Sequence, residues 1–278
     1  MGPGPSHRRR AGAAPAPILA AILAAALAVA PVMTLAAPAA RGAAQAVNVA
    51  VAANFLTTSR ALARRFMASH QARVLISSGS TGKLYAQIRH GAPYDLFLAA
   101  DVRRPRKLEQ AQLIVPGSRF TYAVGRLVLW SRTPGTVDAE GQSLKQGRIA
   151  RLAIANPKTA PYGAAARTVL RHLGLWSRYR GQLVRGENVG QTFQFAVTGN
   201  VDAAFVALSQ VRDAGGGGSR WVVPRNLYPR IEQQAVVLAR AAHRPAVKAF
   251  TAFLRSPAGR SLIRAHGYGV PPGKTAHR

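Results

Sequence analysis

A turn of small polar residues between an apolar strand and a helix is the first feature of this sequence that could bind a ligand. The apolar run 74–76 ends in serines and a glycine, and Leu84 and Ile88 then share one helix face. The first N–H groups of a helix have no partner within it and carry the positive end of its dipole, so this turn suits an anion. On this segment alone, an ordinary helix cap by Ser80 or Thr81 is the favoured interpretation.

The same arrangement occurs at the first strand of the predicted fold. Residues 47–53 form an apolar strand, and Asn54 stands at the N-cap position of a helix that carries Leu56, Leu62 and Phe66. Two strand–helix units with a polar residue at the helix start make a bound anion more credible than either cap alone.

Four strand-to-helix junctions in the chain are small or polar, and ligands of open α/β sheets gather beyond the carboxyl ends of the strands. If two such lobes face each other, all four helix starts can point into one cleft. The donors would be neutral, and neutral donors can hold a dianion by dipoles and hydrogen bonds. A protonated or wrongly sized anion would leave N–H groups unpaired. The junctions are Ala53–Asn54, Ser80–Thr81, Tyr162–Gly163 and Val189–Gly190.

Several classes of catalytic or metal site lack support in this sequence. Gly82 and Lys83 suggest a P-loop, but the first glycine of that motif is Ser77 here and Leu84 follows the lysine. No G-x-S-x-G elbow occurs, the seven histidines lack metal-ligand spacing, and only nine acidic residues are available. The absence of cysteine excludes disulfides and thiolate chemistry. We therefore expect no enzyme, no metal site and no cofactor.

The N-terminus is typical of an export signal. Three arginines at positions 8–10 precede an apolar run over 18–30, and Ala44 and Ala46 end a stretch of small residues. The apolar run is shorter than the ~20 residues that a membrane-spanning helix needs. We expect a signal peptide over residues 1–46, with retention as a membrane anchor as the alternative.

The chain carries a formal net charge of +29, and the part after the predicted leader keeps +25 because the leader holds four arginines and no acid. Such a charge makes nucleic acid or an anionic surface an alternative partner. The cations are scattered along the chain and no nucleic-acid motif accompanies them, so we expect no nucleic acid as the ligand. An acidic medium around the protein would explain the same bias.

Apolar strands alternate with helical patterns along the chain, which predicts an α/β protein with mostly parallel sheets and helices on both faces. The predicted strands are 47–53, 74–76, 96–99, 120–130, 149–155, 183–184, 203–207, 221–223 and 235–238.

Several segments in order resemble the periplasmic molybdate-binding proteins of ABC transporters, over nearly all of residues 47–270. The resembling segments are 51–55, 79–88, 91–101, 156–163, 186–189, 253–257 and 267–269.

The resemblance implies a two-lobe type II periplasmic binding protein fold with two crossing hinge strands, in 122–130 and 233–238. It implies lobe 1 over 47–125 plus 233–270, lobe 2 over 126–232, and a tail over 271–278. It also implies a monomer in the periplasm that binds molybdate or tungstate and delivers it to an inner-membrane ABC permease and its ATPase. The implied contacts are Asn54, Thr81 with Ser80 beside it, the backbones of Tyr162 and Val189, and the neighbouring Ala53.

One position departs from the resemblance. Some members add a tyrosine hydroxyl at the position of Ala207, so that contact is missing here and Tyr162 or Asn54 would have to compensate. Binding of sulfate or another oxyanion on the same fold remains an alternative, as does, in a different class, a basic nucleic-acid or surface-binding protein.

Overall fold

The computed structural model describes Gly2 and residues 45–271. Most of the predicted leader and the tail from residue 272 lie outside the described residues. The strand at the start of the described part begins at Gln45, two residues before the segment that we expected to follow the leader. In the described part of the chain, no helix has the length and apolar character that crossing a bilayer requires.

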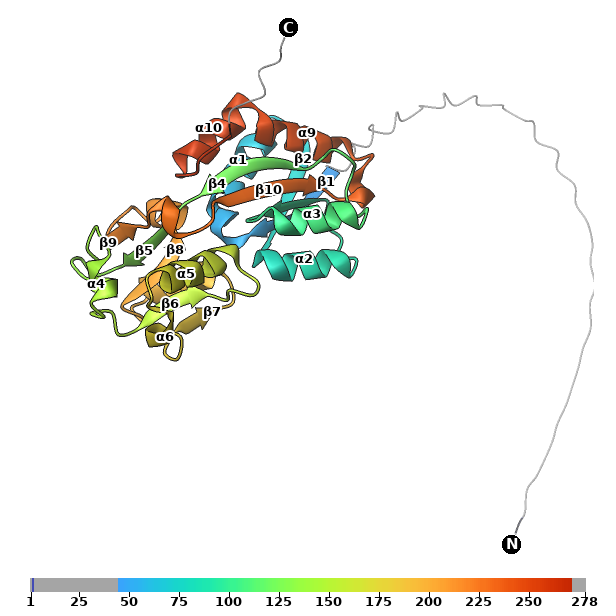
Figure 1. The fold of residues 1–278 in the computed structure, drawn as a ribbon. Coiled ribbons are helices and arrows are strands. Elements are labelled where there is room, and N and C mark those ends of the chain that lie inside the picture. The colour runs from blue at the N-terminus through green and yellow to red at the C-terminus, as the bar shows by residue number, and fades with distance from the viewer. Residues whose placement is uncertain (1, 3–44, 272–278) are drawn as a thin grey trace, which may run out of the picture. The chain divides into compact units, whose positions relative to one another are not determined.

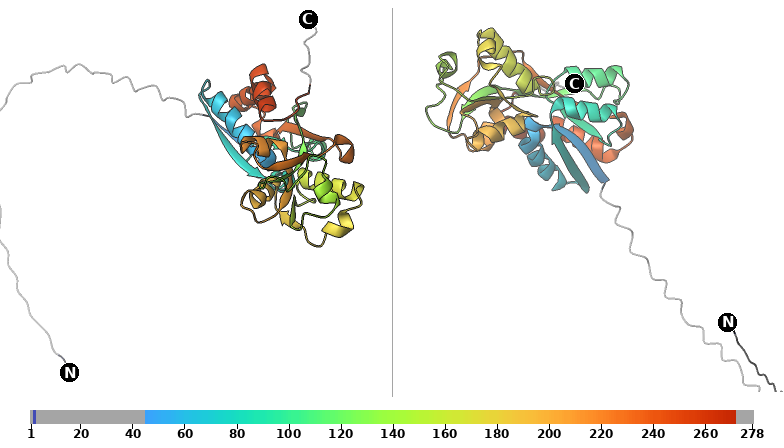
Figure 2. Two further views of the ribbon diagram at one scale, coloured as in Figure 1. Left: turned by 90° about the vertical axis from the view of Figure 1, so that its left-hand side faces the viewer. Right: turned by 90° about the horizontal axis from the view of Figure 1, so that it is seen from below.

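Two five-stranded sheets, each covered by helices, organise the described chain (Figure 1). The first sheet has the order β2-β1-β3-β10-β4 and the second β7-β6-β8-β5-β9. We call the first sheet with its helices lobe 1 and the second sheet with its helices lobe 2; the right-hand view of Figure 2 shows them side by side.

Lobe 1 combines the N-terminal strands and helices with the C-terminal ones. Its elements are β1 (Gln45–Ala52), η1 (Ala53–Phe55), α1 (Leu56–Met67), β2 (Ala72–Gly79), α2 (Thr81–Arg89), β3 (Leu96–Ala99), α3 (Arg103–Gln110), β4 (Phe120–Gly125), β10 (Ile231–Val237), η3 (Ala239–Ala241), α9 (Pro245–Arg255) and α10 (Pro257–Ala265).

Lobe 2 is formed by the middle of the chain. Its elements are β5 (Leu127–Ser131), α4 (Gln142–Lys145), β6 (Leu152–Ala155), α5 (Pro161–His172), α6 (Trp176–Tyr179), β7 (Val184–Gly186), α7 (Val189–Val197), β8 (Ala203–Ala207), α8 (Leu208–Asp213), β9 (Ser219–Val222) and η2 (Arg225–Leu227).

Alternating residues of β1 explain why helices cover both faces of the first sheet. Val49 and Val51 are buried in the cluster that includes residues of α1, α9 and α10, whereas Ala50 is buried with residues of α2 and α3. A strand with both faces buried reads as a continuous apolar run, as β1 does. The two helical layers hold the carboxyl end of β1, and therefore Ala53, in a fixed position.

Both sheets are mixed rather than mostly parallel. In each sheet three strands are parallel, β2-β1-β3 and β7-β6-β8, as the alternating pattern predicted. The other pairings, of β10 with β3 and β4 and of β5 with β8 and β9, are antiparallel. The antiparallel strands are those next to the two places where the chain changes lobe, because a strand that returns from the other lobe enters its sheet from the opposite end.

The chain passes between the sheets at Arg126 and again between β9 and β10. The predicted single strand 120–130 is therefore two strands in two sheets. The lobe boundaries at 125/126 and 232/233 remain our proposal; β10 already begins at Ile231.

Candidate functional site

The starts of four helices surround one small cavity between the lobes. The cavity is small: the space open to the centre of a water-sized sphere is about 10 Å³. On that measure a single water needs roughly 10–15 Å³, so the cavity as it stands holds about one water. All six predicted site residues line the cavity. The full lining is Ala52, Ala53, Asn54, Gly79, Ser80, Thr81, Ala160, Pro161, Tyr162, Asn188 and Val189.

Lobe 1 presents two buried hydroxyls at the start of α2. Ser80 is the N-cap, as predicted, and its Oγ accepts a hydrogen bond from Lys83 N at 3.3 Å. The Oγ1 of Thr81 accepts a hydrogen bond from Ala100 N at 3.1 Å. Since that bond occupies an acceptor site, the hydroxyl proton of Thr81 stays available for donation.

The side chain of Asn54 lies differently from the sequence prediction. A short 3₁₀ helix over Ala53–Phe55 precedes α1, and no side chain caps either of them, so Asn54 is not an N-cap. Its Nδ2 donates to Gln233 Oε1 and to Tyr268 Oη, both at 3.0 Å. Both amide hydrogens are thereby engaged behind the cavity. What Asn54 and Ala53 offer at the start of the 3₁₀ helix is their backbone N–H groups.

Lobe 2 presents backbone N–H groups at two helix starts. Pro161 occupies the first position of α5, where its missing N–H costs nothing, and Tyr162 N follows it. Val189 is the first residue of α7, whose N-cap Asn188 accepts a hydrogen bond from Gln191 N at 3.0 Å. Because Asn188 caps a later N–H, it leaves that of Val189 available.

A buried network of neutral polar side chains lies behind the cavity, where the lobes join. Tyr268 Oη accepts from Asn54 Nδ2 and, at 2.8 Å, from Ser209 Oγ, and it donates to Asn54 O at 2.6 Å. Tyr122 Oη lies 3.1 Å from Gln233 Oε1. We call this set, with Tyr162, the hinge network: Asn54, Tyr122, Tyr162, Ser209, Gln233 and Tyr268.

The tyrosines of the hinge network stay protonated over a wide pH range. Burial is the main cause that raises the pKa of Tyr122, Tyr162 and Tyr268 above the ordinary tyrosine value, and the neighbouring tyrosines add to it at Tyr122 and Tyr162. The ring of Tyr162 extends to the hinge, where Gln233 Nε2 lies 3.4 Å from its Oη. A side chain at Gly125 would lie 2.1 Å from that hydroxyl, so glycine is needed there.

Sequence reasoning missed Gln233, Ser209 and Tyr268. Tyr268 lies in one of the segments that carry the resemblance, and Gln233 is the first residue of a predicted crossing strand. Nothing in the sequence indicates that either side chain points toward Asn54. Ala207 is buried at the N-cap of α8, and its N–H donates to Gln210 Oε1 at 3.0 Å.

In front of the cavity, polar contacts join the lobes. Gly82 N donates to Thr159 O at 2.8 Å, and Arg104 Nη2 donates to Lys158 O at 3.0 Å. Lys83 forms an ion pair with Glu187 on the surface. We call these three contacts the rim contacts. The lobes therefore touch both behind and in front of the cavity, whose lining contains no charged side chain.

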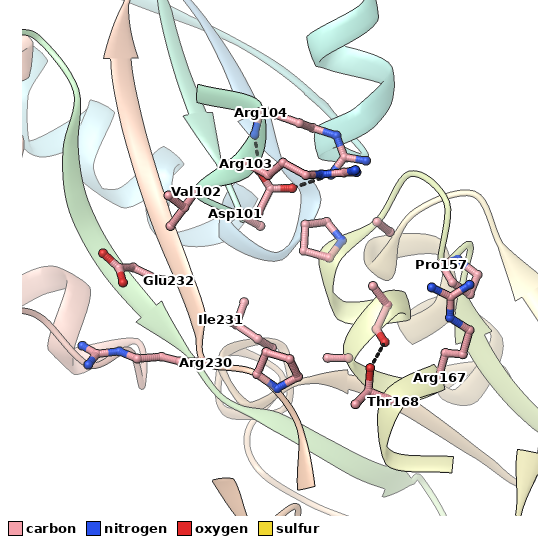
Figure 3. Close-up of a pocket in the computed structure, with 16 residues that line it drawn as sticks. Asp101, Val102, Arg103, Arg104, Pro157, Arg167, Thr168, Arg230, Ile231 and Glu232 are labelled. Atoms are coloured by element: carbon pink, nitrogen blue, oxygen red, sulfur yellow. Dashed lines mark hydrogen bonds and ion pairs between the residues drawn. The ribbon is translucent and has the colours of Figure 1, made fainter. Parts of the chain in front are cut away.

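A larger groove lies beside the cavity and shares Ala160 and Pro161 with it (Figure 3). Its volume is about 460 Å³, far more than a small anion fills. Four arginines, Arg103, Arg104, Arg167 and Arg230, line it together with two acids, Asp101 and Glu232. Among the described residues, no group of three or more histidines and acids could hold a metal ion.

Comparisons with known proteins identify the family and the relatives of this chain. A family described as bacterial extracellular solute-binding protein matches residues 47–269. The molybdate-binding protein ModA of Azotobacter vinelandii is 49% identical over 226 residues, which are 81% of this chain and 90% of that protein. The ModA of Rhodobacter capsulatus is 45% identical over 243 residues, 87% of this chain and 94% of that protein. The solved periplasmic molybdate-binding protein of Azotobacter vinelandii matches with a TM-score of 0.79 at 42% identity, covering 81% of this chain and 100% of that one.

Proposed function

Because the chain belongs to the family of bacterial extracellular solute-binding proteins, we propose that it captures molybdate or tungstate and delivers it to an ABC transporter. A family of this kind supplies the transport step with its solute and performs no chemistry on it. The relatives named for molybdate, at 49% and 45% identity over most of both chains, support the choice of oxyanion.

One observation carries the proposal: four helix starts converge on a small cavity with a neutral lining. A tetrahedral oxyanion has five heavy atoms and needs more room than the single water that the cavity holds, so the lobes part slightly to admit it. Helix starts favour negative charge through their dipoles and their free N–H groups. The proposed donors are the Thr81 and Ser80 hydroxyls and the N–H groups of Ala53, Asn54, Tyr162 and Val189.

All contacts proposed for this site donate hydrogen bonds to the anion, and such a site favours the fully deprotonated anion. A protonated oxyanion brings an O–H that would face a donor, and one buried N–H or hydroxyl would then lose its bond at a cost of about 1–3 kcal/mol. Sulfate is a smaller tetrahedron than molybdate, so in a site spaced for molybdate its oxygens would make longer, weaker hydrogen bonds to the donors. Molybdate and tungstate are almost equal in size, and we propose that the site accepts both.

The same proposal includes export of the protein to the periplasm and an ABC transporter as its partner. The N-terminal segment 1–46 acts as a signal peptide, the protein works as a monomer in the periplasm, and its partners are an inner-membrane permease and its ATPase. The large positive charge would speed the capture of a dianion by electrostatic attraction. No cofactor takes part.

Titration of the purified protein with molybdate, tungstate and sulfate, by calorimetry and by tryptophan fluorescence, tests the proposal. Molybdate and tungstate are expected to bind and to raise the melting temperature, while an excess of sulfate does neither. Saturation by sulfate alone would overturn the choice of ligand. Binding to unrelated DNA that weakens steeply with salt, without any oxyanion binding, would overturn the class.

A matched pair of variants tests the site itself. Thr81→Val removes the hydroxyl and is expected to weaken molybdate binding about tenfold or more, since one hydrogen bond to a charged group is lost. Thr81→Ser keeps the hydroxyl and is expected to bind close to wild type. Thr198→Val, at an exposed position on the C-cap of α7, is the control. Equal affinity in Thr81→Val and wild type would remove Thr81 from the site.

A further inference from the structure

Two consecutive carbonyl groups of lobe 2 are held by donors of lobe 1. Arg104 Nη2 donates to Lys158 O at 3.0 Å and Gly82 N donates to Thr159 O at 2.8 Å. Both carbonyls belong to the loop directly before α5. Since Thr159 N and Ala160 N each donate to Asn156 O, this loop is tied together internally and moves as a unit.

Arg104 is a buried cation whose planar group is divided between the lobes. Only 8% of its side chain is exposed. Its Nη1 is paired with the Asp101 carboxylate, and its own backbone N donates to Asp101 Oδ1 at 3.0 Å, as Figure 3 shows. One end of the guanidinium therefore stays within lobe 1, while the other crosses to Lys158 O.

Arg104 lies between the groups that hold two of the proposed ligand contacts, Thr81 and the N–H of Tyr162. On the lobe 1 side, Asp101 follows Ala100, whose N–H donates to Thr81 Oγ1. On the lobe 2 side, the loop that ends at Ala160 sets the start of α5 and thus the N–H of Tyr162. A side chain at Gly82 would lie 2.9 Å from both Arg104 Nη2 and Thr159 Cα, so the three groups are in close packing.

We propose that Arg104 is a positioning residue that couples lobe closure to oxyanion binding, an inference that rests on the proposed function. It does not touch the anion. Its bond to Asp101 lies within lobe 1 and persists when the lobes separate, whereas its bond to Lys158 O exists only when they meet. The guanidinium therefore stabilises the closed arrangement selectively, and it does so at the loop that aims Tyr162 N at the cavity.

Arginine is suited to this role because its rigid fork can hold two partners in fixed directions. A lysine would keep the charge and the pairing with Asp101, but its compact ammonium cannot span both acceptors. Arg104→Lys is therefore the informative variant. The double variant Asp101→Asn/Arg104→Gln removes both charges and leaves no unpaired carboxylate, in case the single variant folds poorly.

The experiment measures lobe separation and oxyanion affinity in parallel. The chain contains no cysteine, so Ala86→Cys on α2 and Ser177→Cys on α6, both exposed, place one spin label on each lobe. Electron–electron distance distributions are recorded without ligand and with molybdate, and dissociation constants are measured by calorimetry. Arg103→Lys, at the exposed neighbouring arginine, is the control.

Arg104→Lys is expected to broaden the ligand-free distances toward larger separation and to raise the dissociation constant for molybdate about tenfold. The melting temperature of the ligand-free protein should stay close to wild type. Distances and affinity equal to those of wild type would overturn the role of Arg104. Failure of wild type to bind molybdate would overturn the proposed function, while the ligand-free distances would still decide the role of Arg104.

Discussion

The hinge network and the rim contacts hold the same cavity from opposite sides by different means. The hinge network is buried and neutral, and four of its six residues, Asn54, Tyr122, Gln233 and Tyr268, belong to lobe 1. The rim contacts all cross between lobes and include two cations, Arg104 and the exposed Lys83.

The hinge network and the rim contacts therefore have different tasks: the first fixes the direction of donors, and the second holds the lobes closed. Most bonds of the hinge network persist when the lobes part, because they lie within lobe 1, so they fix the direction of the N–H groups at Ala53 and Asn54. The rim contacts must form and break with every capture of a solute. The hydrogen bond from the buried Arg104 guanidinium favours the closed arrangement, because little water competes for it. The rim contacts are few, so the lobes can open again.

The hinge network should carry the larger share of stability. Asn54→Ala removes the amide that serves Gln233 Oε1 and Tyr268 Oη, both buried. We expect a loss of about 2–3 kcal/mol in the free energy of unfolding, since buried polar groups would lose their partner. Urea denaturation without ligand measures it. Asn226→Ala, at an exposed asparagine of η2, is the control, and a loss no larger than that of the control would contradict a structural role of Asn54.

Gly82→Ala should weaken molybdate binding without lowering the stability of the ligand-free protein. The new methyl group would lie 2.9 Å from Thr159 Cα and would hold the lobes apart. An overpacked contact costs about 1–3 kcal/mol, which corresponds to a roughly 5- to 150-fold weaker molybdate affinity. The clash with the Thr159 backbone exists only in the closed form, and the flexible Arg104 side chain in the same lobe can shift away from the methyl group, so the ligand-free melting temperature should not fall.

Gly181→Ala is the matched control, because a side chain there meets no atom within 4 Å. Calorimetry compares the two variants with wild type. If Gly82→Ala binds molybdate as tightly as Gly181→Ala does, the close approach of the lobes at Gly82 is not required for binding.

High pH should weaken the hinge network and leave the arginine of the rim charged. Burial raises the pKa of Tyr122 in the folded state above the value of about 10 in the unfolded chain. Above pH 10 the unfolded state therefore loses this proton first, and stability falls as pH rises, by about 1.4 kcal/mol per pH unit for each such tyrosine. Below pH 10 the contribution is fully present.

Tyr122→Phe should make the alkaline decline shallower by about that slope. Urea denaturation at several pH values between 10 and 12 measures the slope in wild type, in Tyr122→Phe and in the half-exposed control Tyr85→Phe. Identical slopes in wild type and Tyr122→Phe would show that Tyr122 ionises alike in the folded and unfolded chain.

The sequence predicted the parts of the site that depend on local pattern. An apolar run followed by a small polar turn located the helix starts near Ser80 and Val189, and these features need only neighbouring residues. The direction of the Asn54 amide depends on Gln233 and Tyr268, which are 179 and 214 positions away in the chain. No local pattern encodes such a partner.

The sequence did not predict that residues 120–130 form two strands, for a similar reason. The segment is apolar throughout, apart from Thr121, Gly125 and Arg126, and its two halves differ only in which sheet they join. Sheet membership is decided by β10 and β8, which come much later in the chain. Periodicity can identify a strand, but it does not identify the neighbour of that strand.

The ion pair of Lys83 with Glu187 should contribute least among the rim contacts. Both side chains are more than half exposed, at 58% and 55%, so water and salt screen their attraction. Lys83→Gln is expected to weaken molybdate binding by less than about fivefold, and the difference from wild type should vanish at high salt. Calorimetry at two ionic strengths measures both. A loss as large as that of Arg104→Lys, unchanged by salt, would mean that exposed and buried rim contacts act alike, and burial would then not explain why Arg104 governs closure.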